Sequence, residues 1–290
     1  MEIKINGKPL DFALDNEKTI GDILTALEQW LTSSGHRMSE LTIDGKTVSA
    51  SMIEEVFARE INTIKILDIC TNTVADLAVS SLISLLDDIK NYESLDFNDK
   101  TDFFQTWKES AQAQFIGEHW SDLFSLCGGV FSGGSVSSKV LYSITEERLR
   151  EVKKPAQEFS GLKTLLNETC IRLVDLPLDI QTGKDKRAAE TIQFFSSISE
   201  KILRIFRQLD IQGLLLPPDS SASAGAKAGA ENNILTLINN FGTTAKELLE
   251  AYERQDIVLV GDLAEYEMSP QLQKLYDVIA ENIRNTAGNE

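Results

Sequence analysis

The sequence is poor in the residues on which most catalytic and metal sites depend. Its 290 residues include two histidines, His36 and His119, and no HExxH or Glu-x-x-His motif of the kind that zinc and di-iron helices use. The three cysteines, Cys70, Cys127 and Cys170, form no C-x-x-C pair and lie in apolar segments. We therefore expect structural roles for His119 and the cysteines, and a reducing compartment, with the cytoplasm as the default.

Long apolar runs and an excess of positive charge are also missing. The N-terminal MEIKINGKPL has no apolar stretch of a signal peptide, and no run approaches the roughly 20 residues of a membrane span. The 28 Lys and Arg against 45 Asp and Glu give a net charge of −17. Nucleic acid and anionic membranes are bound through cationic surfaces, so we expect neither as a partner. Such a charge is typical of an acidic cytoplasmic surface, or favours a basic partner.

Common motifs of nucleophilic and phosphate-binding sites are absent too. There is no G-x-S-x-G elbow. The stretch CGGVFSGGSVSSK differs from a phosphate loop, because Lys139 comes too late after Gly133 and no strand is expected before it. We expect a loop between two helices, with Ser135 or Ser137 as the cap of the second helix. The sequence thus predicts no catalytic residue and no cofactor.

The first seventy residues show the alternation of strands, interrupted by one amphipathic helix. MEIKI predicts a strand, Asn6-Gly7 favours a type I′ turn, and PLDFAL (residues 9–14) predicts the return strand. A helix is expected from its cap, Thr19, to Gly35, which ends it. A second hairpin around Asp44-Gly45, a short helix at SMIEEVFARE and a last strand at INTIKILDI follow.

This order of elements resembles the ubiquitin-like β-grasp fold, including its small sulfur-carrier proteins. The sulfur carriers act through a free C-terminal Gly-Gly, whereas this chain runs on through Cys70-Thr71-Asn72 without a diglycine. The resemblance therefore implies the other common use of the fold, in which a sheet face or a strand edge docks another protein.

From Thr73, a plausible helix cap, the apolar period changes from two residues to about three and a half. Helices with this period fill most of the remaining chain, and Pro177 is expected to end one of them. The predicted fold class is α+β: a small N-terminal β-grasp (ubiquitin-like) domain, residues 1–70, followed by an all-α helical bundle, residues 73–290. A Pro/Ser/Ala/Gly-rich segment at about 216–231 predicts a flexible loop within the bundle.

The segment DIVLVGDLAEYEMSP, from Asp256 to Pro270, is the strongest candidate for a functional site. Asp256 suits a helix N-cap, and IVLVGDLA predicts a helix that is buried on most sides. Gly261 within it indicates close approach by a neighbouring helix. Ser269 and Pro270 suit the cap and first position of the last helix, which predicts a tight corner between two helices.

Three carboxylates and a tyrosine gather at the predicted corner: Asp262, Glu265, Tyr266 and Glu267. Asp262 and Glu265 lie three residues apart on one helix face, where two carboxylates could share a cation. We favour a structural corner or a partner-docking patch formed by all four residues over a catalytic pair or a metal site. The D-L-x-E-Y-E pattern is similar to one in uncharacterised bacterial helical proteins, a resemblance that implies no activity.

Three functions follow as hypotheses. The first is a non-catalytic, cytoplasmic adaptor or chaperone-like protein whose partner is another protein, basic or an amphipathic helix; a secretion or motility apparatus is one conceivable setting. The second is a metal- or small-ligand-binding protein, or an enzyme, that uses the acidic cluster. The third is a scaffolding homo-oligomer in which apolar stripes pair between chains. The sequence leaves the oligomeric state open.

Overall fold

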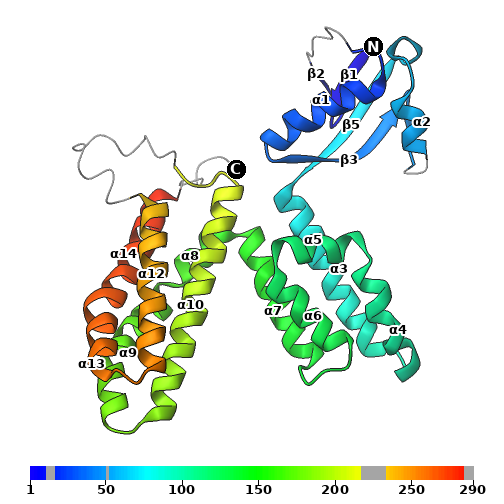
Figure 1. Ribbon diagram of the computed structural model, residues 1–290. Helices are drawn as coiled ribbons and strands as arrows, with labels where there is room; N and C mark the ends of the chain where they lie inside the picture. Colours follow the sequence, from blue (N-terminus) through cyan, green and yellow to red (C-terminus); the bar gives the residue numbers. More distant parts are fainter. Residues whose placement is uncertain (11–16, 50–51, 217–232, 284–290) are drawn as a thin grey trace, which may run out of the picture. The chain divides into compact units, whose positions relative to one another are not determined.

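The structure, a computed structural model, describes four stretches of the chain: residues 1–10, 17–49, 52–216 and 233–283. A five-stranded mixed sheet is followed by helices, which confirms the predicted α+β class (Figure 1). The chain groups into two compact units, Met1–Leu149 and Arg150–Glu290. The predicted domains 1–70 and 73–290 divide the chain differently and stay a prediction. Apart from Leu216, the predicted loop at 216–231 lies outside the described residues.

The sheet is built from five strands that are spread over the first 73 residues. Its strands are β1 (Glu2–Ile5), β2 (Lys8–Leu10), β3 (His36–Ile43), β4 (Lys46–Thr47) and β5 (Ile66–Thr73). Their order is β2-β1-β5-β3-β4, in which β1 and β5 are parallel and the other neighbours are antiparallel. The part of the predicted return strand beyond Leu10, including Phe12 and Leu14, lies outside the described residues.

Both predicted hairpin turns adopt the left-handed backbone that a type I′ turn requires. Asn6 and Gly7 have φ of 52° and 73°, and Asp44 and Gly45 have φ of 48° and 82°. Asn6 also ties the end of β1 to β5, because its side-chain oxygen accepts a hydrogen bond from the Thr71 N–H at 2.8 Å. The turns therefore fix the register of both hairpins.

One helix, α1 (Ile20–Ser33), supplies the apolar layer of the sheet's core. It begins where predicted: the Thr19 hydroxyl accepts from the Asp22 N–H, and the Asp22 carboxylate accepts from the Thr19 N–H at 2.9 Å. The short helices α2 (Ile53–Phe57) and η2 (Ile61–Thr63) follow β4. The core consists of Ile3, Ile20, Ile23, Leu24, Leu27, Ile43, Val56, Ile64, Leu67 and Ile69.

Five helices follow the sheet: α3 (Val74–Ser94), α4 (Phe97–Lys108), α5 (Ala111–His119), α6 (Ser121–Phe131) and α7 (Ser138–Lys153). Thr73 ends β5 and caps α3, as predicted. An aromatic cluster joins α3, α4 and α6, with ring centroids of Tyr92, Phe103 and Phe131 within 5.4 Å of one another. The glycine-rich stretch ends α6 and turns into α7, where the Ser137 hydroxyl accepts from the Val140 N–H. This confirms the loop between two helices.

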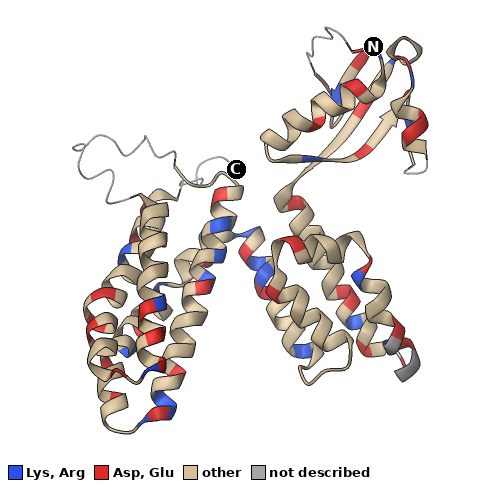
Figure 2. Cartoon of the chain, in the orientation of Figure 1, with Lys and Arg blue, Asp and Glu red and all other residues tan. Residues whose placement is uncertain are grey.

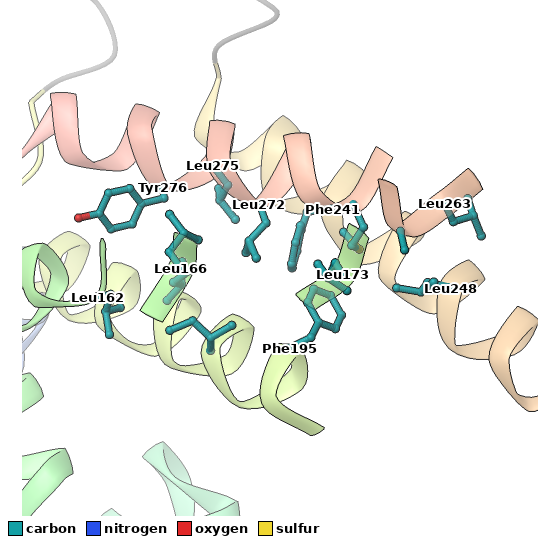
Figure 3. Close-up of a cluster of buried hydrophobic side chains, with 14 of the residues drawn as sticks. Leu162, Leu166, Leu173, Phe195, Phe241, Leu248, Leu263, Leu272, Leu275 and Tyr276 are labelled. Carbon is teal, nitrogen blue, oxygen red and sulfur yellow. The ribbon is translucent and has the colours of Figure 1, made fainter. Parts of the chain in front are cut away.

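The second unit is helical. Its helices are α8 (Pro155–Gly161), α9 (Lys163–Gln181), α10 (Asp185–Ile211), α12 (Ile234–Glu253), α13 (Ile257–Asp262), the π-helical turn η4 (Leu263–Met268) and α14 (Ser269–Asn282). Figure 3 shows leucine and aromatic side chains converging on one core, among them Leu166, Leu173, Phe195, Phe241 and Leu272. None of the helices that the structure describes, in either unit, is long and apolar enough to cross a membrane.

Pro177 lies inside α9, so the prediction that it ends the helix is wrong. Proline removes one backbone hydrogen bond, but tertiary contacts hold the last turn in place. Leu173 and Leu176 are buried before the proline. After it, the buried Asp179 carboxylate pairs with Lys184 at 3.4 Å and Arg187 at 3.0 Å. Packing on both sides thus outweighs the local preference of proline.

Candidate functional site

The predicted acidic site lies on an unbroken helical segment rather than at a corner. Asp256 caps α13 as predicted, because its carboxylate accepts from the Leu259 N–H at 3.1 Å. Beyond α13, the backbone of Met268 (φ −70°, ψ −45°) and Ser269 (φ −61°, ψ −47°) stays helical. The expected corner, with Ser269 as a cap that starts a new helix at Pro270, is therefore wrong.

The turn η4 provides the physical reason for this continuity. In a regular α-helix the Pro270 ring would clash with the carbonyl four residues earlier, that of Tyr266. A π-helical turn widens the helix just before the proline and so makes room for the ring. Such turns are rare in proteins and are found mostly as single turns, frequently at functional sites.

The turn η4 has one side in the core and one side that carries the predicted site residues. Leu263, Ala264 and Met268 are buried and pack into the second unit. Asp262 and Glu267 are exposed and Glu265 is half-buried. The Tyr266 side chain, 68% exposed, is the largest apolar surface of the turn. The structure thus places the four predicted residues together on the outer side of one helical segment.

The three carboxylates are not neutralised by the rest of the described chain. Among the residues that the structure describes, no hydrogen bond or ion pair involves the side chains of Asp262, Glu265 or Glu267. Within the same residues, no three His, Cys, Asp or Glu side chains come together as a group that could hold a metal ion. The arrangement therefore leaves charged oxygen atoms free to meet a group from outside this chain.

The helix α9 lies alongside α13 and η4 and runs antiparallel to them. A Cβ atom at Gly261 would lie 3.2 Å from the Pro177 Cγ, which confirms the close approach predicted for this glycine. Further along, the Cys170 thiol donates a hydrogen bond to the Ser269 carbonyl at 3.7 Å. In the direction in which residue numbers decrease from 177 to 170 along α9, they increase from 261 to 269 along the facing segment. We call the line along which these helices meet the α9–α13 seam.

Exposed aliphatic side chains border this seam, and the sequence did not reveal them. On α9, Ile171, Val174 and Leu178 are 65%, 45% and 57% exposed; we call these three residues the α9 row. On α13, Val258 is 74% exposed. The expectation that IVLVGDLA is buried on most sides is therefore wrong, because the apolar period shows which residues share a face but not whether a neighbour covers that face.

Acidic residues dominate the segment that includes the seam's α13 side (Figure 2). From Glu247 to Glu281 there are nine Asp and Glu against two basic residues, Arg254 and Lys274. Arg254 already pairs with Glu250 at 3.3 Å. The α13 side of the seam thus belongs to a segment with an excess of negative charge.

His119, Cys127 and Cys170 are packed against other parts of the protein. The His119 ring stacks on Phe115, with centroids 4.1 Å apart, and one ring nitrogen bonds to the Phe115 carbonyl. Cys127 is buried in α6, and this burial raises the pKa of its thiol to about 12, so the thiolate is not formed at neutral pH. The half-buried Cys170 also has a raised pKa through burial. All three cysteines are free thiols.

Comparison with known proteins gives relatives for most of the chain. Residues 1–73 match the model of the TP0873 N-terminal domain family. Residues 158–278 match a domain of unknown function, DUF8042, and this stretch includes the α9–α13 seam. An uncharacterized protein of Treponema pallidum (strain Nichols) is 24% identical over 281 residues, which cover 96% of each chain. No solved structure matches the chain.

Proposed function

We propose that the protein is a non-catalytic protein-interaction module of the cytoplasm, an adaptor or chaperone-like protein that binds another protein. The observation behind this proposal is the α9 row, whose exposed aliphatic side chains border unpaired carboxylates. Contiguous exposed apolar surface rimmed by polar groups is typical of a protein-binding site. A secretion or motility apparatus that handles basic or amphipathic helices is one setting for such a module.

The N-terminal sheet supports a second contact in the same proposal. We propose that residues 1–73 form a ubiquitin-like β-grasp domain, on the basis of the strand order β2-β1-β5-β3-β4 and the two type I′ hairpins. In this sheet β2 and β4 are the edge strands. A domain of this kind presents a sheet face or a strand edge to a partner.

The test is affinity capture with the full chain as bait in extract of the source organism, followed by mass spectrometry. The proposal predicts one protein retained in stoichiometric amount at moderate salt. An unrelated acidic protein of similar size, bound to the same resin as a second bait, controls for nonspecific capture. If the full chain retains no protein above background in repeated captures, the interaction function is wrong.

A further inference from the structure

We infer that the α9 row and the carboxylates of Asp262 and Glu265 form one docking surface for a basic amphipathic helix of another protein. This inference rests on the proposed function and specifies both the surface and the chemistry of the partner. Its components come from α9 on one side of the seam and from α13 and η4 on the other side.

The spacing of the α9 row matches the length over which helices contact each other. Ile171, Val174 and Leu178 are three and four residues apart, so they occupy one face of α9 over about 10 Å at roughly 1.5 Å per residue. A partner helix places apolar anchors at i, i+3 or i+4, and i+7 over the same distance. The row therefore fits about two turns of an amphipathic helix.

The antiparallel register places the carboxylates beside this row. Val174 lies midway between Cys170 and Pro177 on α9, two residues that contact the facing segment. Glu265 lies midway between Gly261 and Ser269, the residues that they contact. Val174 and Glu265 are thus at the same level along the seam.

The neighbouring positions extend this pairing by one turn. Asp262 and Leu178 are each adjacent to one of the two residues that meet here, Gly261 and Pro177, so the second carboxylate lies within one helical turn of the end of the row. Val258, one turn before Gly261, adds exposed apolar surface at that end.

Charge complementarity selects the kind of helix that binds. The Asp262 and Glu265 carboxylates have no ion pair within the described chain, and the Glu247–Glu281 segment has nine acidic residues against two basic ones. An acidic or neutral helix would leave these carboxylates partly desolvated without compensation. A helix with Lys or Arg beside its apolar anchors would pair with them, and the same charges would speed association at low salt.

The inference can be tested on the full chain with a synthetic amphipathic helix of about 18 leucine and lysine residues, roughly five turns. Its leucines lie on one face, and a control peptide of the same composition has them scattered. Fluorescence anisotropy of the labelled peptides gives Kd at several salt concentrations. We expect the amphipathic peptide to bind at least about tenfold more tightly than the control, a difference of about 1.4 kcal/mol.

Matched variants assign the binding to this surface. The triple change Ile171→Ser, Val174→Ser and Leu178→Ser should weaken binding at least about tenfold, whereas Leu235→Ser, at another exposed leucine (64% exposed), should have little effect. The pair Asp262→Asn and Glu265→Gln should weaken binding and reduce its salt dependence. The pair Glu247→Gln and Glu253→Gln removes the same charge from α12. It should weaken binding less, and should reduce the salt dependence of binding less.

Three results would overturn the inference. The first is equal binding of both peptides by the full chain, and the second is unchanged binding by the triple variant. The third is self-association of the full chain in light scattering that the triple variant abolishes, because the occupant would then be a second copy. Capture from extract separates this inference from the proposed function: a partner retained equally by the full chain and the triple variant contradicts only the surface.

Discussion

Helices α1 and α9 both have apolar side chains at helical spacing, and the surrounding structure covers them to different extents. On α1 the apolar face lies against the sheet, where Ile20, Ile23 and Leu27 are buried. On α9, Leu166 and Leu173 enter the core of the second unit, while the α9 row remains exposed on another face. The apolar face of α1 is therefore buried in a core. Helix α9 has one apolar face in a core and a second apolar face that no other described part of the unit covers.

The strongest test of this contrast compares two faces of α9 itself. Leu173→Ala removes a fully buried side chain and is expected to lower the free energy of unfolding by about 2–5 kcal/mol. Ile171→Ala changes an exposed side chain and should stay within about 0.5 kcal/mol of the unchanged protein. Urea unfolding followed by circular dichroism measures both. A cost above about 2 kcal/mol for Ile171→Ala would show that the row belongs to the core.

Glycine replacements test how tightly α1 is covered. A Cβ atom at Gly21 would lie 2.9 Å from the Phe57 side chain and 3.0 Å from its carbonyl oxygen, so Gly21→Ala must displace α2. We expect a loss of about 1–3 kcal/mol. Gly242→Ala in α12 meets no atom within 4 Å and should gain about 0.8–1 kcal/mol through helix propensity. Hydrogen exchange localises both effects, and a stabilising Gly21→Ala would contradict the close packing of α1.

The junction between the sheet and the helices depends on the cap of α3. Asp76 accepts hydrogen bonds from the Thr73 hydroxyl at 2.7 Å and the Thr73 N–H at 3.1 Å, which together lower the pKa of Asp76 below its ordinary value. A carboxyl group whose pKa is lower in the folded protein stabilises the fold. This stabilisation is complete above the pKa of the unfolded chain, about 3.9, and is lost as the pH falls through the pKa of the folded protein.

Thr73→Ala should therefore cost about 1 kcal/mol at neutral pH and bring the Asp76 pKa back towards its ordinary value. Urea unfolding between about pH 6 and pH 3 and an NMR titration of the Asp76 carboxyl carbon measure the two effects. If the Asp76 pKa were the same in both proteins, the hydrogen bond from the Thr73 hydroxyl would be absent in solution.

Local signals in the sequence predicted the turns, the caps and one close contact. Asn6-Gly7 and Asp44-Gly45 formed the expected hairpins, because positive φ is a local property of these residues. Thr73 and Asp256 capped their helices because each side chain accepts a hydrogen bond from a backbone N–H three residues later, which is also a local property. Gly261 also lies against a neighbouring helix as expected, because a residue without a side chain lets another helix approach closely.

Features that depend on the tertiary environment could not be predicted in the same way. Pro177 and Pro270 favour helix breaks locally, but burial on both sides of Pro177 and the widened turn η4 before Pro270 keep the helices continuous. The exposure of Val258 and of the α9 row depends on which faces other helices cover. The acidic residues of the candidate surface come from one short stretch of the sequence, but its apolar half comes from α9, about eighty residues earlier.

The most direct test of the account is methyl NMR of the full chain during titration with the basic amphipathic peptide. If this face of α9 is the docking surface, the methyl signals of Ile171, Val174, Leu178 and Val258 shift together and saturate, while those of Leu235 stay in place. Shifts confined to other methyl groups, or no shifts at peptide concentrations that saturate anisotropy, would contradict the claim that this exposed face of α9 is a docking surface.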